Sequence, residues 1–555
     1  MNRSILNKFS ISNHKKIILS LFCYFVVGCI LVPFYRYSQR GDIVSYLSIS
    51  EKYINGNFSD AVNGVWSPLL SWLLIPFFLM DIEILLGFKI LQLMIGAFII
   101  FIVLKYSELL GIRKNYQHYL LLGTTSIIIY YFTFFLGSPD LLVAALLFYY
   151  LFNISKISYL VNPTAGLKSG ILGSIAFYSK AFSFPFFILH FTLINVYYLY
   201  LYPSHRNKIK KNYLHGMGLF ILVCSIWILI ISLKYDYFTY STASAYNFNI
   251  IGPKYESINT FRINALFPPS NETAVSYWED PTFLPIEKWH PFSSPSNLIF
   301  FFEHIISNVV LMLYYIFIFS PFFLFLLIFK FKDYKTLDPI LTVALVTIFT
   351  YSLGYVTLFI YERFVILIYI LVIALSFWFM IDFIESLNKS KLKKVIFFSI
   401  FIASIIAKPI YSTIKFYNEG EDLNILSKIL ERKKISGSYA GISKKPLDVD
   451  WSNTLFLAYR SKSQFYGEVN PDQEIEIIFK ELKKYNIDYL FDWRNDVKIV
   501  HPNFEKILDL KMTVEEKNPF DKIISTLDVF KEAIKAKNQR ITGSNVKVYK
   551  MIYHQ

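Results

Sequence analysis

The sequence contains few charged residues and few cysteines for its length. Charged residues make up 17% of the 555 positions, hydrophobic residues make up 55%, and the mean hydropathy is +0.43. This balance excludes an ordinary soluble protein, because so much apolar surface would not stay in solution. The three cysteines, Cys23, Cys29 and Cys224, all lie inside apolar runs, which excludes a disulfide framework. No Cys/His spacing typical of a zinc site occurs.

The chain also lacks the patterns of a protein that binds nucleic acids or nucleotides. Its net charge is +15, but the Lys and Arg residues form short clusters between apolar runs, so membrane topology explains the charge better than a nucleic-acid partner does. Residues 437–441 read Gly-Ser-Tyr-Ala-Gly and lack the Gly-x-Gly-x-x-Gly spacing that brings backbone amides to a pyrophosphate. We therefore expect neither kind of partner.

What the sequence does contain is a series of apolar runs between Lys16 and about Ser412, each near the ~20 residues that cross a bilayer. The candidate spans are 17–35, 85–104, 119–137, 140–155, 169–180, 182–202, 216–233, 303–329, 338–359, 364–383 and 395–412. The sequence therefore predicts an α-helical multi-pass membrane protein with about 11 transmembrane helices, in an inner or plasma membrane.

Basic clusters in every second loop predict the orientation, because cytoplasmic loops carry an excess of Lys and Arg. Residues 1–16 are basic and are predicted to be cytoplasmic, with the first span as a retained signal anchor. The loops 35–83 and 234–297 and the C-terminal part, 413–555, are then predicted to face outward. The same alternation assigns the apolar stretch 66–80 to a helix lying against the outer leaflet, since a further span would turn later basic loops outward.

The C-terminal part has the composition of a small folded domain. Hydropathy falls from about Thr413 onward, and apolar and charged residues alternate there at helical or strand spacing. The predicted helices are 421–434 and 472–485, and the predicted strands are 438–442, 488–493 and 546–553. We therefore predict a small extracytoplasmic α/β domain over residues 413–555, after a transmembrane domain over residues 17–412.

The first outward loop holds the most specific pattern in the chain. Gly41-Asp42 follows the first span, Tyr46 comes four residues later, and Trp66-Ser67-Pro68-Leu69 opens an apolar helix. Ser138-Pro139-Asp140, the run 173–180 that ends in Lys180, and Tyr361-Glu362-Arg363-Phe364 follow in order. Together these motifs resemble the GT-C fold glycosyltransferases, and in particular the protein O-mannosyltransferase and lipid A aminoarabinose transferase group, over most of residues 17–410.

The resemblance implies a donor sugar carried on a polyprenyl phosphate, displaced in one inverting step by an acceptor hydroxyl, without a cofactor. Such a step needs a base beside the nucleophile, and Asp42 is the candidate. The residues alone leave a second interpretation of Asp42 open, as a solvated loop acid or a helix N-cap. Val44 interrupts any Asp-x-Asp or Asp-x-Glu pair, so we expect transfer without a metal, unlike in GT-C members that use paired acids.

Negative charge develops on the leaving lipid phosphate, so we expect cations at the outer membrane face to stabilise it. Lys180 and Arg363 lie where apolar runs meet that face, and Arg40 is a further candidate, although cations at the ends of spans also snorkel to the interface without any substrate. The candidates for substrate contact are Asp140, Tyr46, Trp66 and Glu362. Asp140 also fits a helix start after Ser138, and aromatic residues are ordinary at a bilayer interface.

The second long loop offers further polar groups. Trp278-Glu279-Asp280 and Trp289-His290 supply carboxylates and an imidazole for acceptor binding or for a lid, and a solvated loop is the alternative interpretation.

Three other classes of protein share some of these features. A polysaccharide polymerase or O-antigen ligase also uses polyprenyl-linked sugars, but it functions through a late outer loop rich in Arg and His. Here loop 234–297 has Lys254, Arg262, Lys288 and His290 as its basic candidates.

A lipid or solute transporter would carry charged residues in the middle of its spans and would have broken helices in two matching halves. Such features are scarce here, apart from helix breaks at two prolines. A non-catalytic sensor is the third class. The sequence fixes neither the sugar nor the acceptor, which is a lipid, a glycan or a protein.

Overall fold

The computed structural model describes residues 11–112, 114–254, 266–332, 338–443, 450–494, 499–511 and 545–553. Most of the predicted cytoplasmic N-terminus, 1–16, lies outside the described residues. The chain divides into two compact units, and each is described by itself. The first comprises Met1–Pro33, Leu86–Leu229 and Phe301–Ile410, and the second comprises Phe34–Leu85, Ile230–Phe300 and Tyr411–Gln555.

Apolar helices dominate the chain, as the hydropathy predicts. Eight described helical stretches are long and apolar enough to cross a membrane: Lys16–Tyr35, Ile84–Leu109, Ser183–Leu201, Pro203–Tyr235, Pro295–Phe319, Pro339–Val356, Glu362–Ser386 and Lys391–Lys415. The chain is therefore a multi-pass membrane protein.

The predicted count of about 11 spans is not reproduced. Three predicted spans correspond to helices α6 (Asn115–Phe134), α7 (Pro139–Ile154) and α9 (Ala165–Ser179), which are shorter or less apolar than those eight. The predicted span 303–329 is wrong as one helix, because the chain breaks at Pro321 into α14 (Pro295–Phe319) and α15 (Phe323–Lys332). Proline lacks the N–H that would continue the helix and its ring clashes with the preceding turn.

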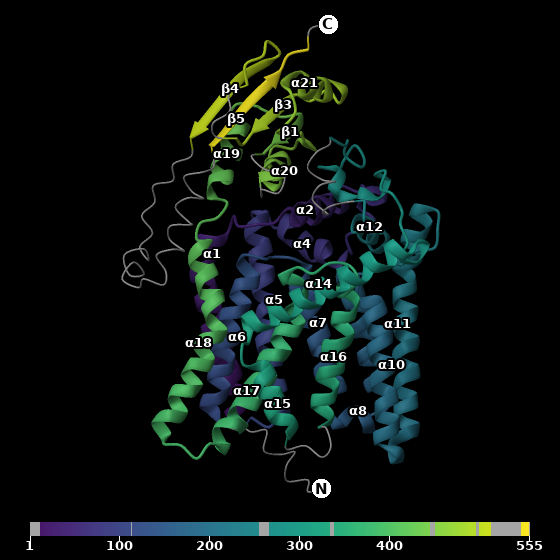
Figure 1. The fold of residues 1–555 in the computed structure, drawn as a ribbon, viewed down its shortest axis with the longest axis vertical. Coiled ribbons are helices and arrows are strands. Elements are labelled where there is room, and N and C mark those ends of the chain that lie inside the picture. Colours follow the sequence, from purple (N-terminus) through teal and green to yellow (C-terminus); the bar gives the residue numbers. More distant parts are fainter. Residues whose placement is uncertain are drawn as a thin grey trace. The chain divides into compact units, whose positions relative to one another are not determined.

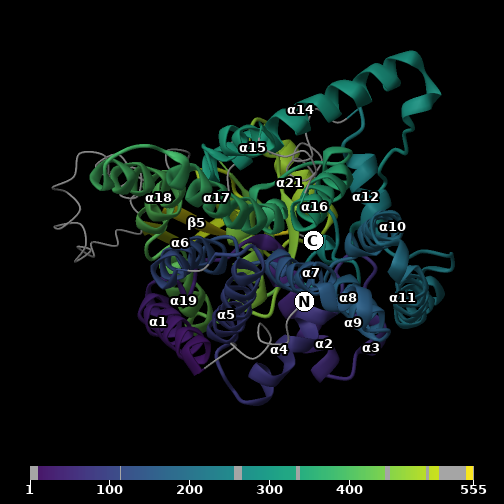
Figure 2. The ribbon, with the colours of Figure 1, turned by 90° about the horizontal axis from the view of Figure 1, so that it is seen from below.

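The remaining helices of the first unit, or those that begin or end in it, pack around a buried centre. They are α1 (Ile11–Tyr35), α5 (Ile84–Leu109), α8 (Ile157–Val161), α10 (Ser183–Leu201), α11 (Arg206–Tyr235), α16 (Pro339–Val356), α17 (Ile366–Ser386) and α18 (Lys391–Lys415). Nearly every residue of α7 and of the first half of α17 is buried. Figure 2 shows α15 and α17 side by side and α7 near the middle of the helices.

Glycines bring two helices of this unit together. A Cβ atom on Gly166 would lie 1.9 Å from the carbonyl oxygen of Asn212, and one on Gly170 would lie 2.3 Å from that of Gly216. Small residues four apart let helix backbones approach closely in a membrane, where van der Waals contact rather than water drives association. This spacing therefore fixes α9 against α11.

The second unit combines short helices with a sheet. Its helices are α2 (Gly41–Ile54), α3 (Phe58–Ala61), α4 (Leu69–Leu79), α12 (Ala243–Ile250), α19 (Glu421–Arg432), α20 (Asp450–Arg460) and α21 (Ile475–Lys484). At eleven residues, α4 would reach only about 16 Å, too short for a bilayer core of about 30 Å. This length agrees with the prediction that 66–80 does not form a span.

The C-terminal sheet has five strands in the order β2-β1-β3-β5-β4. They are β1 (Ser438–Ile442), β2 (Gln464–Glu468), β3 (Tyr489–Asp492), β4 (Phe504–Lys511) and β5 (Asn545–Met551). β2 and β3 run parallel to β1, whereas β5 runs antiparallel to its two neighbours. The predicted α/β domain is confirmed (Figure 1), although β2, β4 and α20 were missed because they are short or carry mixed periodicity.

The second unit gathers distant parts of the sequence. It contains the segments 34–85 and 230–300 together with the tail from Tyr411, close to the loops 35–83 and 234–297 and the domain 413–555 that the charge pattern assigns to the outer side. Leu266 from the long loop is 2% exposed and belongs to the hydrophobic core of the tail domain, with Ile442, Leu490 and Tyr549. The outward orientation itself stays a prediction.

Candidate functional site

In the second unit, Asp42 lies in the first turn of α2. Arg40, not Asp42, occupies the N-cap position, so the structure does not support the N-cap interpretation of Asp42. The helix N-terminus stabilises an acid there electrostatically. The side chain of Asp42 is half-buried, and the indole Nε1–H of Trp278 donates to its Oδ1 atom at 3.2 Å.

Aromatic side chains pack around Trp278, the donor to this carboxylate. Tyr46, one turn after Asp42, meets Trp66 edge to face with ring centroids 5.3 Å apart, and Trp66 meets Trp278 at 6.0 Å. Tyr246 of α12 also meets Trp278 edge to face, with ring centroids 5.9 Å apart. All four rings are buried. The indole that donates to Asp42 is therefore held in a buried aromatic cluster.

A buried ion pair fixes Trp278 to α2. Glu279, the next residue, accepts a hydrogen bond from Ser48 at 2.8 Å and pairs with Lys52. Ser48 and Lys52 are four residues apart and so share one face of the helix. The side chains of Lys52 and Glu279 are 3% and 2% exposed. Burial raises the pKa of Glu279, whereas Lys52 and Ser48 oppose this shift. The solvated-loop interpretation is therefore wrong for Glu279, and nothing in the sequence singled out Lys52.

In the first unit, three of the predicted residues come together. Ser138 caps α7: its Oγ accepts the backbone N–H of Asp140 at 3.3 Å and donates to the Asp140 carboxylate at 2.9 Å. Asp140, 2% exposed, pairs with Lys180 at the end of α9, and Arg363 Nε lies 3.8 Å from its Oδ2. The helix-start interpretation of Asp140 is confirmed, Asp140 is also the partner of two cations, and its contact with substrate stays a prediction.

Both cations of this group are partly exposed. Two cations share one carboxylate, and their side chains remain 22% and 17% exposed while Asp140 is buried. Lys180 Nζ lies 3.9 Å from the ring centre of Phe364, and the Arg363 guanidinium lies 5.2 Å from it. A buried carboxylate and an aromatic ring thus hold both cations in place, and their exposed parts can contact an anion.

The other predicted site residues have partners of their own. Arg40 lies 3.6 Å from Glu419 in the second unit, and Glu362 lies 2.6 Å from Lys408 in the first. The sequence analysis did not select Lys89 in α5, which is 1% exposed and donates to the carbonyl oxygen of Phe134 at 2.8 Å. A cation inside an apolar helix was the available signal, since such residues are costly in a membrane.

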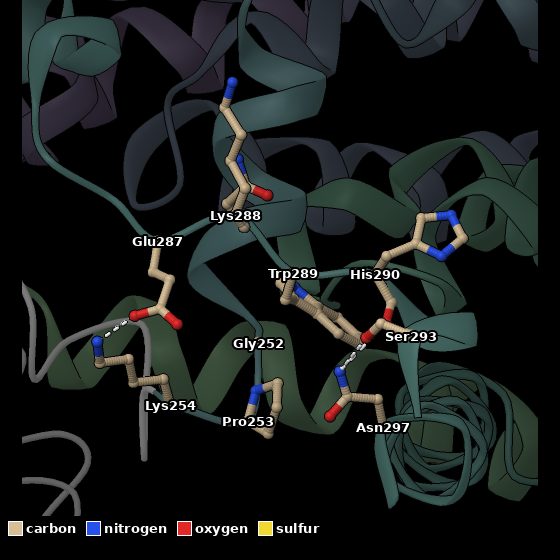
Figure 3. Close-up of a pocket in the computed structure, with 10 residues that line it drawn as sticks. Gly252, Pro253, Lys254, Glu287, Lys288, Trp289, His290, Ser293 and Asn297 are labelled. Carbon is tan, nitrogen blue, oxygen red and sulfur yellow. Dashed lines mark hydrogen bonds and ion pairs between the residues drawn. The ribbon is translucent and has the colours of Figure 1, made fainter. Parts of the chain in front are cut away.

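The long loop of the second unit forms a pocket of about 480 Å³, drawn in Figure 3. Trp289 lies between the Glu287–Lys254 ion pair and the Ser293–Asn297 hydrogen bond. The pocket is also lined by Asn249, Gly252, Pro253, Lys288 and His290.

Contacts on several sides fix Trp289 in this pocket. Its indole N–H donates to the carbonyl oxygen of Phe248 at 2.7 Å, and the two rings stack at 4.9 Å. A Cβ atom on Gly252 would lie 2.5 Å from the indole. The ring is therefore a rigid apolar surface among polar groups. Within the described residues, no group of three or more His, Cys, Asp or Glu side chains is placed to hold a metal ion.

No protein-family model and no curated protein matches the chain. Among solved structures, it is similar to the crystal structure of ArnT from Cupriavidus metallidurans bound to undecaprenyl phosphate, at 13% sequence identity and a TM-score of 0.44. The similarity covers 80% of this chain and 75% of that chain. ArnT is a GT-C lipid A aminoarabinose transferase, from the group that the sequence motifs resemble. At this degree of similarity, activity and substrate have to be argued from the side chains of this chain.

Proposed function

We propose that this protein is a membrane glycosyltransferase that moves a sugar from a polyprenyl-phosphate donor to an acceptor hydroxyl on the extracytoplasmic face. The observation that carries the proposal is the half-buried carboxylate of Asp42, in the first turn of α2, which accepts a hydrogen bond from the buried indole of Trp278. The motif containing Asp42 resembles the GT-C pattern, and its surroundings suit a base that works away from bulk water.

In the proposed reaction, the acceptor oxygen attacks the anomeric carbon of the donor sugar. The bond from that carbon to the phosphate oxygen breaks, polyprenyl phosphate leaves with the electron pair, and the hydroxyl proton passes to Asp42. A single displacement of this kind inverts the anomeric configuration. The indole N–H of Trp278 donates to Oδ1 of this carboxylate and so orients the proposed base.

Lys180 and Arg363 are proposed to bind the donor phosphate. The support is their arrangement, in which two partly exposed cations share the buried Asp140. Cations beside the leaving oxygen stabilise the charge that develops as the glycosidic bond breaks. Asp140 then acts as the residue that orients both cations. Arg40 and Glu362 remain candidates for donor and substrate contact.

The Trp289 pocket is proposed to bind the acceptor. A sugar ring presents an apolar face of C–H groups and a rim of hydroxyls, and this pocket combines an indole surface with amide, hydroxyl and charged groups. The acceptor class that fits it is a glycan or a glycolipid.

The function is tested by sugar transfer in proteoliposomes that contain the purified protein, an acceptor fraction and one radiolabelled polyprenyl-phosphate sugar at a time. Transfer from one donor, with the inverted configuration in the product, supports the proposal and names the sugar. A failure of every donor would reject the proposal in favour of a polymerase, a ligase that uses longer lipid-linked glycans, or a transporter.

Arg363→Gln is expected to lower kcat/KM for the donor about tenfold to thirtyfold, the cost of one charge-assisted hydrogen bond to the phosphate. Initial rates at varied donor concentration measure it. Lys114→Gln is the matched control, because Lys114 pairs with Glu385 and is 54% exposed. Equal donor kinetics in the two variants would assign Arg363 to a structural role beside Asp140.

Trp289→Ala is expected to raise KM for the acceptor about fivefold to twentyfold while KM for the donor stays unchanged, because the aromatic surface is lost without a change in the base. Phe238→Ala is the control, since Phe238 is an aromatic residue of the same loop that is 85% exposed. A rise in KM for the donor alone would place the donor in this pocket instead.

A further inference from the structure

Strand β2 forms one edge of the C-terminal sheet, and the long loop covers that edge. The amide of Phe465 donates to the carbonyl oxygen of Val275, and the amide of Phe267 donates to that of Tyr466, both at 2.7 Å. The side chain of Gln464 donates to the carbonyl oxygens of residues 272 and 274 at 3.1 and 3.4 Å. An uncovered edge strand would expose unpaired backbone N–H and C=O groups. The loop satisfies some of these groups on β2, so the pairing stabilises the fold.

The same loop segment carries the side chain that contacts Asp42. Ser276 forms a bridge with Phe465, and its hydroxyl accepts the backbone N–H of Trp278 at 3.2 Å. Only Tyr277 therefore lies between the bridge to β2 at Ser276 and the indole that donates to Asp42. A shift of the segment on β2 would be transmitted directly to this hydrogen bond.

The tail domain also holds the other partner of that hydrogen bond, helix α2. Tyr459 of α20 donates to Glu51 of α2 at 2.6 Å. Arg460 pairs with Glu83 at 3.0 Å, and Arg36, just before α2, pairs with the same carboxylate. Figure 1 shows α20 beside the sheet of the tail domain. The C-terminal domain is thus bonded both to the helix that carries Asp42 and to the segment that carries Trp278.

We propose that the C-terminal domain positions the general base: β2 holds segment 266–280 so that Trp278 orients the Asp42 carboxylate, with α20 fixing α2 against it. Trp278 and Gln464 are then positioning residues that act through Asp42 and do not touch substrate. This inference rests on the proposed function, because it takes Asp42 to be the base. The pairing of β2 with segment 266–280 is tested separately from activity.

The experiment compares wild type, Gln464→Ala, Trp278→Phe and the double variant. Hydrogen exchange followed by mass spectrometry reports the pairing through peptides that contain Phe267 and Phe465. Gln464→Ala is expected to speed exchange in these peptides and to lower kcat about threefold to tenfold with an unchanged KM for the donor, as for a misplaced base. In the Trp278→Phe background, Gln464→Ala is expected to cause no further loss, because both changes act through one contact.

Lys480→Ala is the control, since Lys480 is an exposed residue on α21 of the same domain. Two results would overturn the proposal. One is faster exchange in Gln464→Ala without a loss of kcat. The other is a loss of kcat in the double variant equal to the product of the two single losses. If Gln464→Ala leaves exchange unchanged, Glu481→Ala is added, because Glu481 accepts the backbone N–H of Leu266 at 3.2 Å. Unchanged exchange in that combination also overturns it. A wild type that transfers no sugar rejects the proposed function, whereas exchange still reports the pairing of β2 with the segment.

Discussion

Asp42→Asn is expected to lower kcat for sugar transfer about a hundredfold or more, with KM for the donor changed less than about threefold. The amide nearly matches the carboxylate in shape, and Asn can still accept the N–H of Trp278. What the variant loses is the ability to take the proton of the acceptor hydroxyl. The chemical step therefore slows while binding persists, which initial-rate kinetics with the active donor measure.

Asp81→Asn is the matched control. Asp81 is an exposed acid of the same loop, and its backbone has a positive φ of 52°, which asparagine also adopts readily. This control should transfer sugar at the wild-type rate. If Asp42→Asn also retains that rate, Asp42 is structural, and the base has to be sought at Asp140 or in the long loop.

Lys52→Met is expected to destabilise the second unit by about 3–5 kcal/mol, because it leaves Glu279 buried without its cation. Both side chains are almost fully buried, so water cannot replace the lost partner. Ser48 and the backbone N–H of Val275 remain as hydrogen-bond donors to Glu279, at 2.8 and 3.4 Å. The measurement is the apparent midpoint of thermal unfolding in detergent, at a fixed scan rate.

The loss of stability caused by Lys52→Met should depend on pH. Burial raises the pKa of Glu279 above the usual value of 4.5, so the folded protein binds this proton at a higher pH than the unfolded chain does. The contribution of Glu279 to stability is therefore favourable at low pH and falls as pH rises from about 4.5 through the raised pKa. Without Lys52 the pKa rises further, which predicts a larger loss at pH 8 than at pH 5.

The double variant Lys52→Met/Glu279→Gln is the control for the mechanism. It removes both charges, keeps the shape of residue 279, and should recover most of the lost stability, because the penalty comes from the unpaired carboxylate. Equal midpoints for wild type and Lys52→Met would show that the pair is dispensable. A double variant no more stable than Lys52→Met would attribute the loss to packing of the lysine stem.

The motifs selected candidate site residues but did not show how these residues are arranged. Lys180 and Arg363 were both selected as cations at the outer face, but their common partner, Asp140, was a separate candidate until the structure brought the three together. The partners lie 40 and 223 positions away from Asp140 in the sequence, counted from 180 − 140 and 363 − 140. Spacing alone cannot show such contacts, because they depend on how α7 and α9 pack.

In the second long loop, the sequence pattern gave a wrong expectation of burial. Trp278 and Glu279 lie in a polar stretch with no helical or strand periodicity, which reads as a solvated loop. The structure buries both, since the segment pairs with an edge strand 190 residues later and inserts Glu279 beside Lys52. Long-range pairing of this kind leaves no local signal in either partner.

By itself the sequence determined the membrane class, most of the helices and the tail domain, because apolar run length and alternation record local burial directly. It also determined Asp42 as the candidate base through a motif. Only the tertiary structure decided which cations meet Asp140, that Glu279 is buried, and that the tail domain reaches Trp278 and α2. Those contacts join residues distant in the chain, and their free energy comes from burial and charge pairing that exist only once the chain has folded.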